Sequence, residues 1–77
     1  MKIYVVMCAN EDGYISVVGS RKMLEKAQDL MKSNWGNTCQ GLHEEGFVPT
    51  MKMDEFSALL NWGEGHLLRY LIDEITV

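Results

Sequence analysis

Residues 2–18 read KIYVVMCANEDGYISVV, and this stretch decides the fold class. Its first half, Lys2 to Cys8, is rich in β-branched and aromatic residues and is apolar on both alternating faces, which is typical of a strand inside a sheet. The Asp12-Gly13 pair is a turn signal, because glycine supplies the positive φ that tight hairpin turns need. The sequence therefore predicts an antiparallel hairpin with a return strand from Tyr14 to Val18.

After the hairpin, the spacing of the apolar residues changes to a helical period. Ser20 is a favourable N-cap, and the apolar residues between Met23 and Met31 recur on one helix face. We therefore predict a helix from Arg21 to Ser33. The tripeptide Asn34-Trp35-Gly36 is expected to end it, with the glycine in the left-handed conformation.

The second half of the chain is less regular in its pattern. Residues 37–49, which contain Gly41, Gly46 and Pro49, are expected to form a long loop. Residues 54–62 have the apolar spacing of a short helix. Residues 68–77 match both a helix and a strand, and a strand is preferred because the first strand needs a second neighbour.

These elements predict one small α+β domain over residues 1–77. The expected sheet has three antiparallel strands in the order 2-1-3, with one long and one short helix packed on it. The uncovered face would carry Tyr4, Val6 and Cys8 or their alternates. An exposed apolar face calls for a partner, so a homodimer or a complex with another protein is expected.

Composition excludes several classes of function. Seven Lys and Arg against eleven Asp and Glu leave a net charge of −4, which disfavours binding to nucleic acid. No apolar run approaches the roughly 18 residues that span a bilayer, and no secretory signal is recognisable. The two cysteines do not form a disulfide framework. We therefore expect a cytoplasmic protein that does not bind membranes.

Two constellations of residues could carry chemistry. Cys8, Cys39, His43 and His66 have the composition of a zinc site but lack paired ligand spacing, so no metal or other cofactor is expected. Cys39 and His43 could also serve as a nucleophile and its base, although nothing in the sequence marks an orienting group or an oxyanion site. A non-enzymatic protein is preferred, and a small enzyme or ligand-binding domain using Cys39 and His43 stays open as the alternative.

The tryptophans are the strongest indication of an interaction surface, because tryptophan is enriched in interface hot spots. Burial of both against the sheet is the competing interpretation. The predicted contact residues are Trp35, Glu44, Glu45, Phe47 and Trp62. The acidic pair would steer the approach to a basic partner protein.

The order of elements resembles that of the short ββα(α)β accessory proteins of bacteriophages and prophages. The stretches that carry the resemblance are KIYVV at 2–6, VVGSRKMLEKAQDLM at 17–31 and YLIDEITV at 70–77. The resemblance implies a small inhibitor or modulator that binds a host protein and acts by steric occlusion. It carries over no functional residue.

Overall fold

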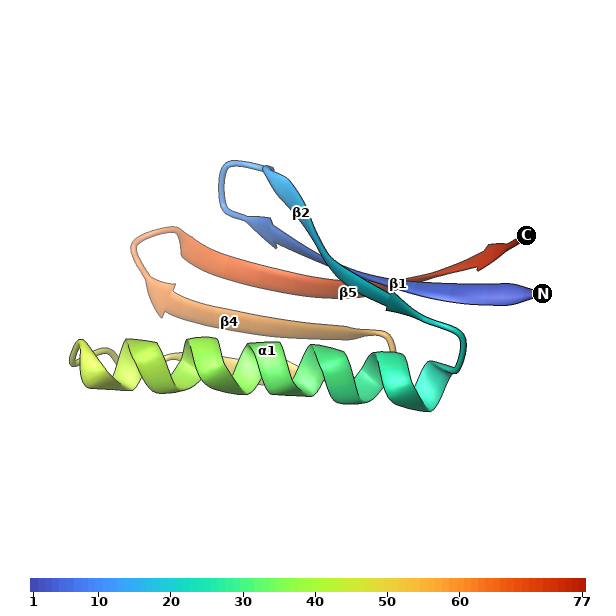
Figure 1. The fold of residues 1–77 in the computed structure, drawn as a ribbon. Coiled ribbons are helices and arrows are strands. Elements are labelled where there is room, and N and C mark those ends of the chain that lie inside the picture. The colour runs from blue at the N-terminus through green and yellow to red at the C-terminus, as the bar shows by residue number, and fades with distance from the viewer.

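Five antiparallel strands and one long helix make up the protein, and the computed structural model describes all of residues 1–77. In chain order the elements are β1 (Lys2–Asn10), β2 (Ile15–Arg21), α1 (Leu24–Glu44), β3 (Thr50–Met53), β4 (Ser57–Gly63) and β5 (His66–Thr76). The strands form a single sheet in the order β2-β1-β5-β4-β3. Helix α1 runs along one face of this sheet, and no element covers the other face (Figure 1).

The predicted N-terminal hairpin is confirmed by strands β1 and β2. The side chain of Asn10 organises its turn, because Oδ1 accepts hydrogen bonds from the amides of Asp12 and Tyr14 at 3.0 and 3.1 Å. Gly13 has a φ of +85°, as the Asp-Gly signal requires. A bulge interrupts the pairing between Val6 and Met7, so Met7 pairs with Val17.

The predicted C-terminal strand is also confirmed, and it begins slightly earlier, at His66. Strand β5 pairs with the whole length of β1, from Lys2 opposite Thr76 to Asn10 opposite Leu68. This pairing places β1 between β2 and β5. It also brings the two chain ends together, and the terminal amine donates to the Val77 carbonyl oxygen at 3.2 Å.

The prediction of a three-stranded sheet with a second helix is wrong. Residues 50–63 form the hairpin of β3 and β4, and β4 pairs with β5 on its other side. Asp54 stabilises the turn, because its Oδ1 accepts from the amides of Phe56 and Ser57 and from the Ser57 hydroxyl. The side chains of β4 instead alternate between the two faces of the sheet, with Ala58 and Leu60 buried against α1.

The predicted end of the first helix at residues 34–36, and the loop after it, are wrong as well. Helix α1 continues through Gly36 and Gly41 to Glu44, and only residues 45–49 connect it to β3. Its first residue follows Met23, which makes no side-chain cap, whereas Ser20 lies in β2. Tertiary packing explains the length, since Met31, Cys39 and Leu42 are buried along the helix and outweigh the cost of the two glycines.

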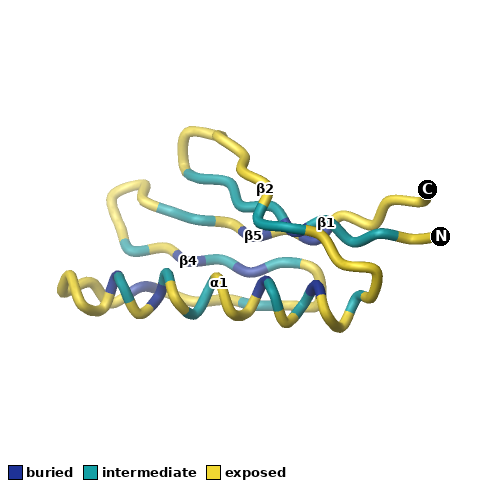
Figure 2. The backbone as a smooth tube through the Cα atoms, viewed as in Figure 1, coloured by how far each residue is buried: buried dark blue, intermediate teal, exposed yellow.

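The core lies between α1 and the face of the sheet that it covers (Figure 2). Its larger cluster combines four residues of the sheet with Ala27 and Met31 of the helix; the sheet residues are Val6, Ala58, Tyr70 and Ile72. A smaller cluster near the end of the helix contains Cys39, Leu42 and Leu60.

Helix α1 is too polar to cross a bilayer.

Candidate interaction surface

The face of the sheet that points away from α1 carries a strip of apolar side chains. Successive side chains of a strand alternate between faces. Since Val6, Tyr70 and Ile72 point towards the helix, their neighbours along β1 and β5 point outwards. Val17 of β2 shares this outer side, because it lies opposite Met7. We call this surface the open face, and its apolar members on β2, β1 and β5 include Ile3, Val5, Met7, Val17, Leu71 and Ile75.

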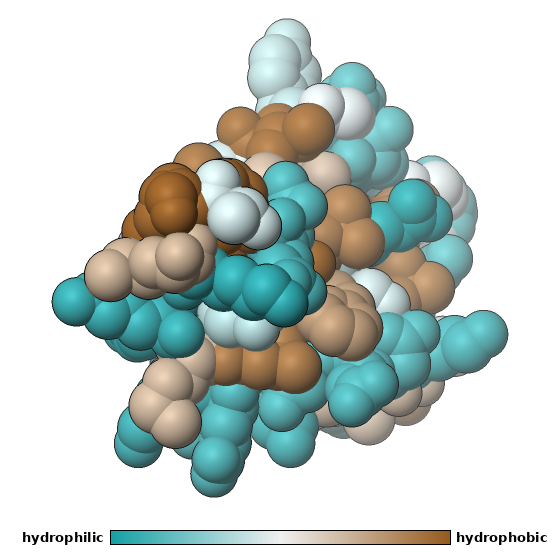
Figure 3. Space-filling model, turned by 90° about the vertical axis from the view of Figure 1, so that its right-hand side faces the viewer, coloured by the Kyte–Doolittle hydropathy of each residue, from teal (hydrophilic) through white to brown (hydrophobic).

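Half of these side chains are exposed to solvent. Val17, Leu71 and Ile75 are 69%, 40% and 41% exposed, and the other three are half-buried by their neighbours in the sheet. Figure 3, which looks at the end of the molecule that carries both termini, shows apolar side chains reaching the surface between polar ones. Apolar side chains that gather on one surface mark an interaction site more often than the same side chains scattered singly.

The open face also carries charges of both signs on β5. Arg69 and Asp73 lie two residues before and two residues after Leu71, so all three side chains share this face. Neither charge has a partner within the chain. The two ion pairs of the structure join Lys2 to Glu74 and Glu11 to His66. Arg69 and Asp73 are therefore available to groups outside the chain.

A shallow hollow of about 280 Å³ adjoins this strip, over β3, β4 and β5. Lys52, Leu59 and Arg69 lie opposite one another on the three strands, so the two cations flank an apolar residue. Leu71 lies at the edge of the hollow and joins it to the apolar strip. Asp54 lines the hollow as well, so the hollow carries charges of both signs around an apolar centre.

The residues predicted for the contact surface lie elsewhere. Trp35 is half-buried between the two core clusters, and its indole Nε1 donates to the Leu59 carbonyl oxygen at 3.4 Å. Glu44 and Glu45 are exposed at the end of α1, and Phe47, 40% exposed, follows in the connection to β3. Glu44, Glu45 and Phe47 are thus exposed to solvent, whereas Trp35 is not.

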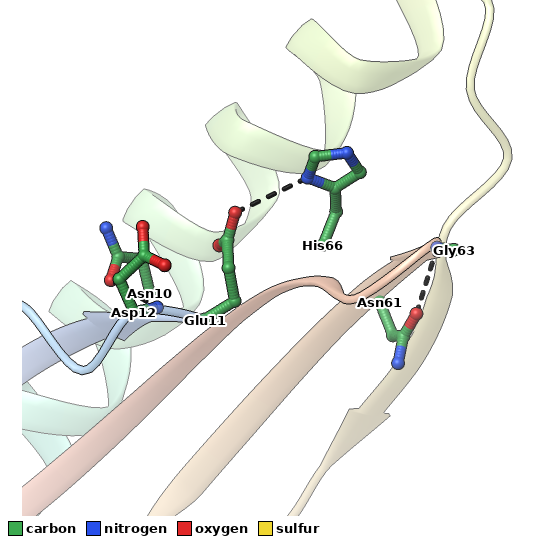
Figure 4. A network of polar contacts seen from close by, with 6 residues as sticks. All are labelled: Asn10, Glu11, Asp12, Asn61, Gly63 and His66. Atoms are coloured by element: carbon green, nitrogen blue, oxygen red, sulfur yellow. Dashed lines mark hydrogen bonds and ion pairs between the residues drawn. The ribbon is translucent and has the colours of Figure 1, made fainter.

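Trp62 takes part in a polar cluster at the turns of two hairpins. Its indole stacks on the imidazole of His66, with ring centroids 5.8 Å apart and planes at 6°. The carboxylate of Glu11, in the turn between β1 and β2, points towards His66 with 3.4 Å between Oε1 and Nδ1 (Figure 4). A hydrogen bond from the backbone amide of Glu11 is the main reason that the pKa of its carboxyl lies below its ordinary value, and the hydrogen bond with His66 lowers this pKa further. The cluster ties the two turns together.

The residues considered for a metal or nucleophile site are dispersed. Cys39 is buried, and its Sγ lies 3.2 Å from Sδ of Met51. His43, one helical turn later, is exposed and makes no hydrogen bond with it. Cys8 packs against the larger cluster, where burial raises the pKa of its thiol. No three His, Cys, Asp or Glu side chains gather closely enough to share a metal ion.

Sequence reasoning missed the residues that define the open face. Arg69, Leu71 and Asp73 were not singled out, because residues 68–77 fit a helix as well as a strand. The available signal was the alternation within this segment, in which buried Tyr70 and Ile72 separate the three outward residues. Once β5 is a strand, that alternation assigns them to one face.

No protein-family model matches this chain, and no curated protein and no solved structure matches it.

Proposed function

We propose that this protein is a non-enzymatic protein-interaction module that binds a protein partner through the open face of its sheet. The observation that carries the proposal is the uncovered apolar strip on β2, β1 and β5, in a molecule whose single helix covers only the opposite face. A sheet with one solvated face normally presents polar residues there. In this protein the solvated face instead carries the apolar residues Val17, Leu71 and Ile75.

The strip supplies the driving force for binding. Full burial of a valine, leucine or isoleucine side chain is worth about 1.5–3 kcal/mol, and a partner would cover the exposed parts of three such side chains. Arg69 and Asp73 would add orientation more than affinity, because exposed charges chiefly select a complementary partner. The proposed mode of action is steric occlusion, in which the bound module blocks a surface of its partner.

The partner is a host protein or a second copy of this chain. The resemblance to phage accessory proteins supports the first, as an inhibitor or modulator of a host protein. The contact surface of Trp35, Glu44, Glu45, Phe47 and Trp62 stays a prediction beside the open face. Of these residues, Glu44, Glu45 and Phe47 have the exposure that direct contact requires.

The proposal is tested by changing Leu71 to Lys, which places a charge in the middle of the strip. Tagged wild-type protein and Leu71→Lys are compared by affinity capture from bacterial lysate and by sedimentation of the purified protein. Gln40→Lys is the matched control, because it also adds one positive charge and Gln40 is exposed on α1, away from the open face. We expect the partner, foreign or a second copy, to be kept by wild type and by the control and lost by Leu71→Lys.

Retention of the same partner by Leu71→Lys would contradict the proposal. So would a wild-type protein that binds neither another protein nor itself. Thermal unfolding of each variant shows whether a loss of binding reflects a loss of folding, and we expect Leu71→Lys to stay folded because its side chain points into solvent.

A further inference from the structure

We propose that the occupant of the open face is a second copy of this chain, related by a twofold axis that passes beside Leu71. The two sheets would stack face to face, with Arg69 of each copy opposite Asp73 of the other. This inference rests on the proposed function, since it names the partner of the same surface.

The order of residues along β5 is compatible with a twofold symmetric interface. In a symmetric dimer the same patch meets itself, so each residue must suit the residue to which the axis brings it. We consider a twofold axis that lies midway between the two sheets, perpendicular to β5 and level with Leu71. This axis places Leu71 of one copy opposite Leu71 of the other. It also places Arg69 of each copy opposite Asp73 of the other, because these two residues lie equally far from Leu71 along the strand.

The same charges exclude the other stacking direction. An axis parallel to β5 would place Arg69 opposite Arg69 and Asp73 opposite Asp73, and like charges across an interface are unfavourable. The two β5 strands must therefore run antiparallel across the interface, within the roughly 30° rotation that packed sheets adopt. The charge pattern thus selects one orientation of the two that stack β5 on β5.

The apolar residues fit this orientation as well. Val17, Met7 and Leu71 lie opposite one another on three neighbouring strands, so they form a row across the sheet at the level of the axis. In the dimer, this row would pack against the same row of the other copy. Facing sheets pack about 10 Å apart, a spacing that valine, methionine and leucine side chains from both sides can fill.

The size of the face is sufficient for a stable interface, and its charge pattern favours a second copy. The molecule measures 43 × 22 × 17 Å. Its largest face therefore spans about 950 Å² at most, against about 800 Å² buried by each partner in a standard interface. Charges of both signs, Arg69 and Lys52 against Asp73, suit a copy with the same pattern better than a strongly acidic or basic protein.

The test is a charge reversal across the proposed axis. The dimer dissociation constant is measured by sedimentation equilibrium for wild type, Arg69→Glu, Asp73→Arg and the double variant Arg69→Glu/Asp73→Arg. Each single variant turns two opposite-charge contacts into two like-charge contacts, so we expect its dissociation constant to rise about tenfold or more. The double variant restores both contacts, and we expect it to return to within about threefold of wild type.

Lys26→Glu is the matched control, because it changes the net charge as Arg69→Glu does but lies exposed on α1. It is expected to leave the dissociation constant unchanged. A wild-type dimer with no rescue in the double variant would overturn the twofold arrangement. A wild-type monomer up to submillimolar concentration would overturn the second copy as the occupant. If Leu71→Lys still abolished capture of a foreign protein by that monomer, the proposed function would stand; if it did not, both would fail.

Discussion

At the scale of single residues, Tyr70 shows how the core holds a polar group. The residue is 1% exposed, and its hydroxyl donates to Oδ1 of Asn34 at 2.8 Å and lies 3.0 Å from Oγ1 of Thr38. The phenol therefore joins β5 to the middle of α1. Burial raises the pKa of Tyr70, because the ionised form would lose its hydration.

We predict that Tyr70→Phe lowers the free energy of unfolding at neutral pH by about 1 kcal/mol, the usual net value of a buried hydrogen bond. Chemical denaturation measures this difference. Tyr14→Phe is the control, because Tyr14 is 74% exposed in the first hairpin turn, and it is expected to have almost no effect. Equal losses in the two variants would show that the Tyr70 hydroxyl does not stabilise the fold.

The raised pKa of Tyr70 also predicts a pH dependence. Above about pH 10 the unfolded chain releases the phenol proton while the folded protein keeps it, so the unfolded state gains stability. The contribution of Tyr70 is therefore complete below that pH and declines as the pH rises. Burial of Cys8 acts in the same direction. Tyr70→Phe should unfold with a shallower alkaline decline than wild type, and an unchanged decline would refute this assignment.

At the scale of elements, α1 shows how tertiary packing overrides local signals. Gly36 and Gly41 lie inside the helix, and a Cβ atom added at either position meets nothing within 4 Å. Both are helical positions where glycine serves no turn. Gly46, just beyond the end of the helix, has a φ of +92° and does require glycine.

We predict that Gly36→Ala and Gly41→Ala each raise the free energy of unfolding by about 0.5–1 kcal/mol, because alanine loses less backbone entropy in a helix. Gly46→Ala is expected to lower it, since alanine is strained at that φ. Thermal and chemical denaturation measure all three. If Gly36→Ala destabilised the protein as much as Gly46→Ala, the helix would end near residue 36.

The strands differ in how well the sequence predicts them. The first hairpin was predictable because its turn contains Asp-Gly and its strand residues are β-branched. Strand β4 was missed because Phe56, Leu59 and Leu60 also fit a helical spacing, and its partner β5 lies further along the chain. A short apolar segment of this kind becomes a strand or a helix according to the neighbours it finds.

At the scale of the whole molecule, two layers leave the sheet with unequal faces. Leu60 and Leu71 lie on the neighbouring strands β4 and β5 but on opposite faces, and they are 0% and 40% exposed. Substituting each of these two leucines therefore compares the stability contributed by a core position with that of a position on the open face.

We predict that Leu60→Ala lowers the free energy of unfolding by about 2–5 kcal/mol, through lost burial and the cavity that it leaves. Leu71→Ala should cost much less when measured at a concentration where the chain is monomeric, because its side chain is partly solvated. Chemical denaturation at low protein concentration provides both values. Similar losses in the two variants would mean that the open face is covered within a single chain.

The sequence by itself determined the α+β class, the first hairpin, the strand at the C-terminus and the two-faced character of β1. These features depend on local turn chemistry, β-branched residues and period-two alternation, all of which act between near neighbours. The length of α1, the strands β3 and β4 and the choice of the exposed face were decided only by the tertiary structure. Alternation shows that β1 has two apolar faces. The position of the helix decides that Val6 is buried and that the side of Val5 and Met7 is left open, and this follows from contacts between distant parts of the chain.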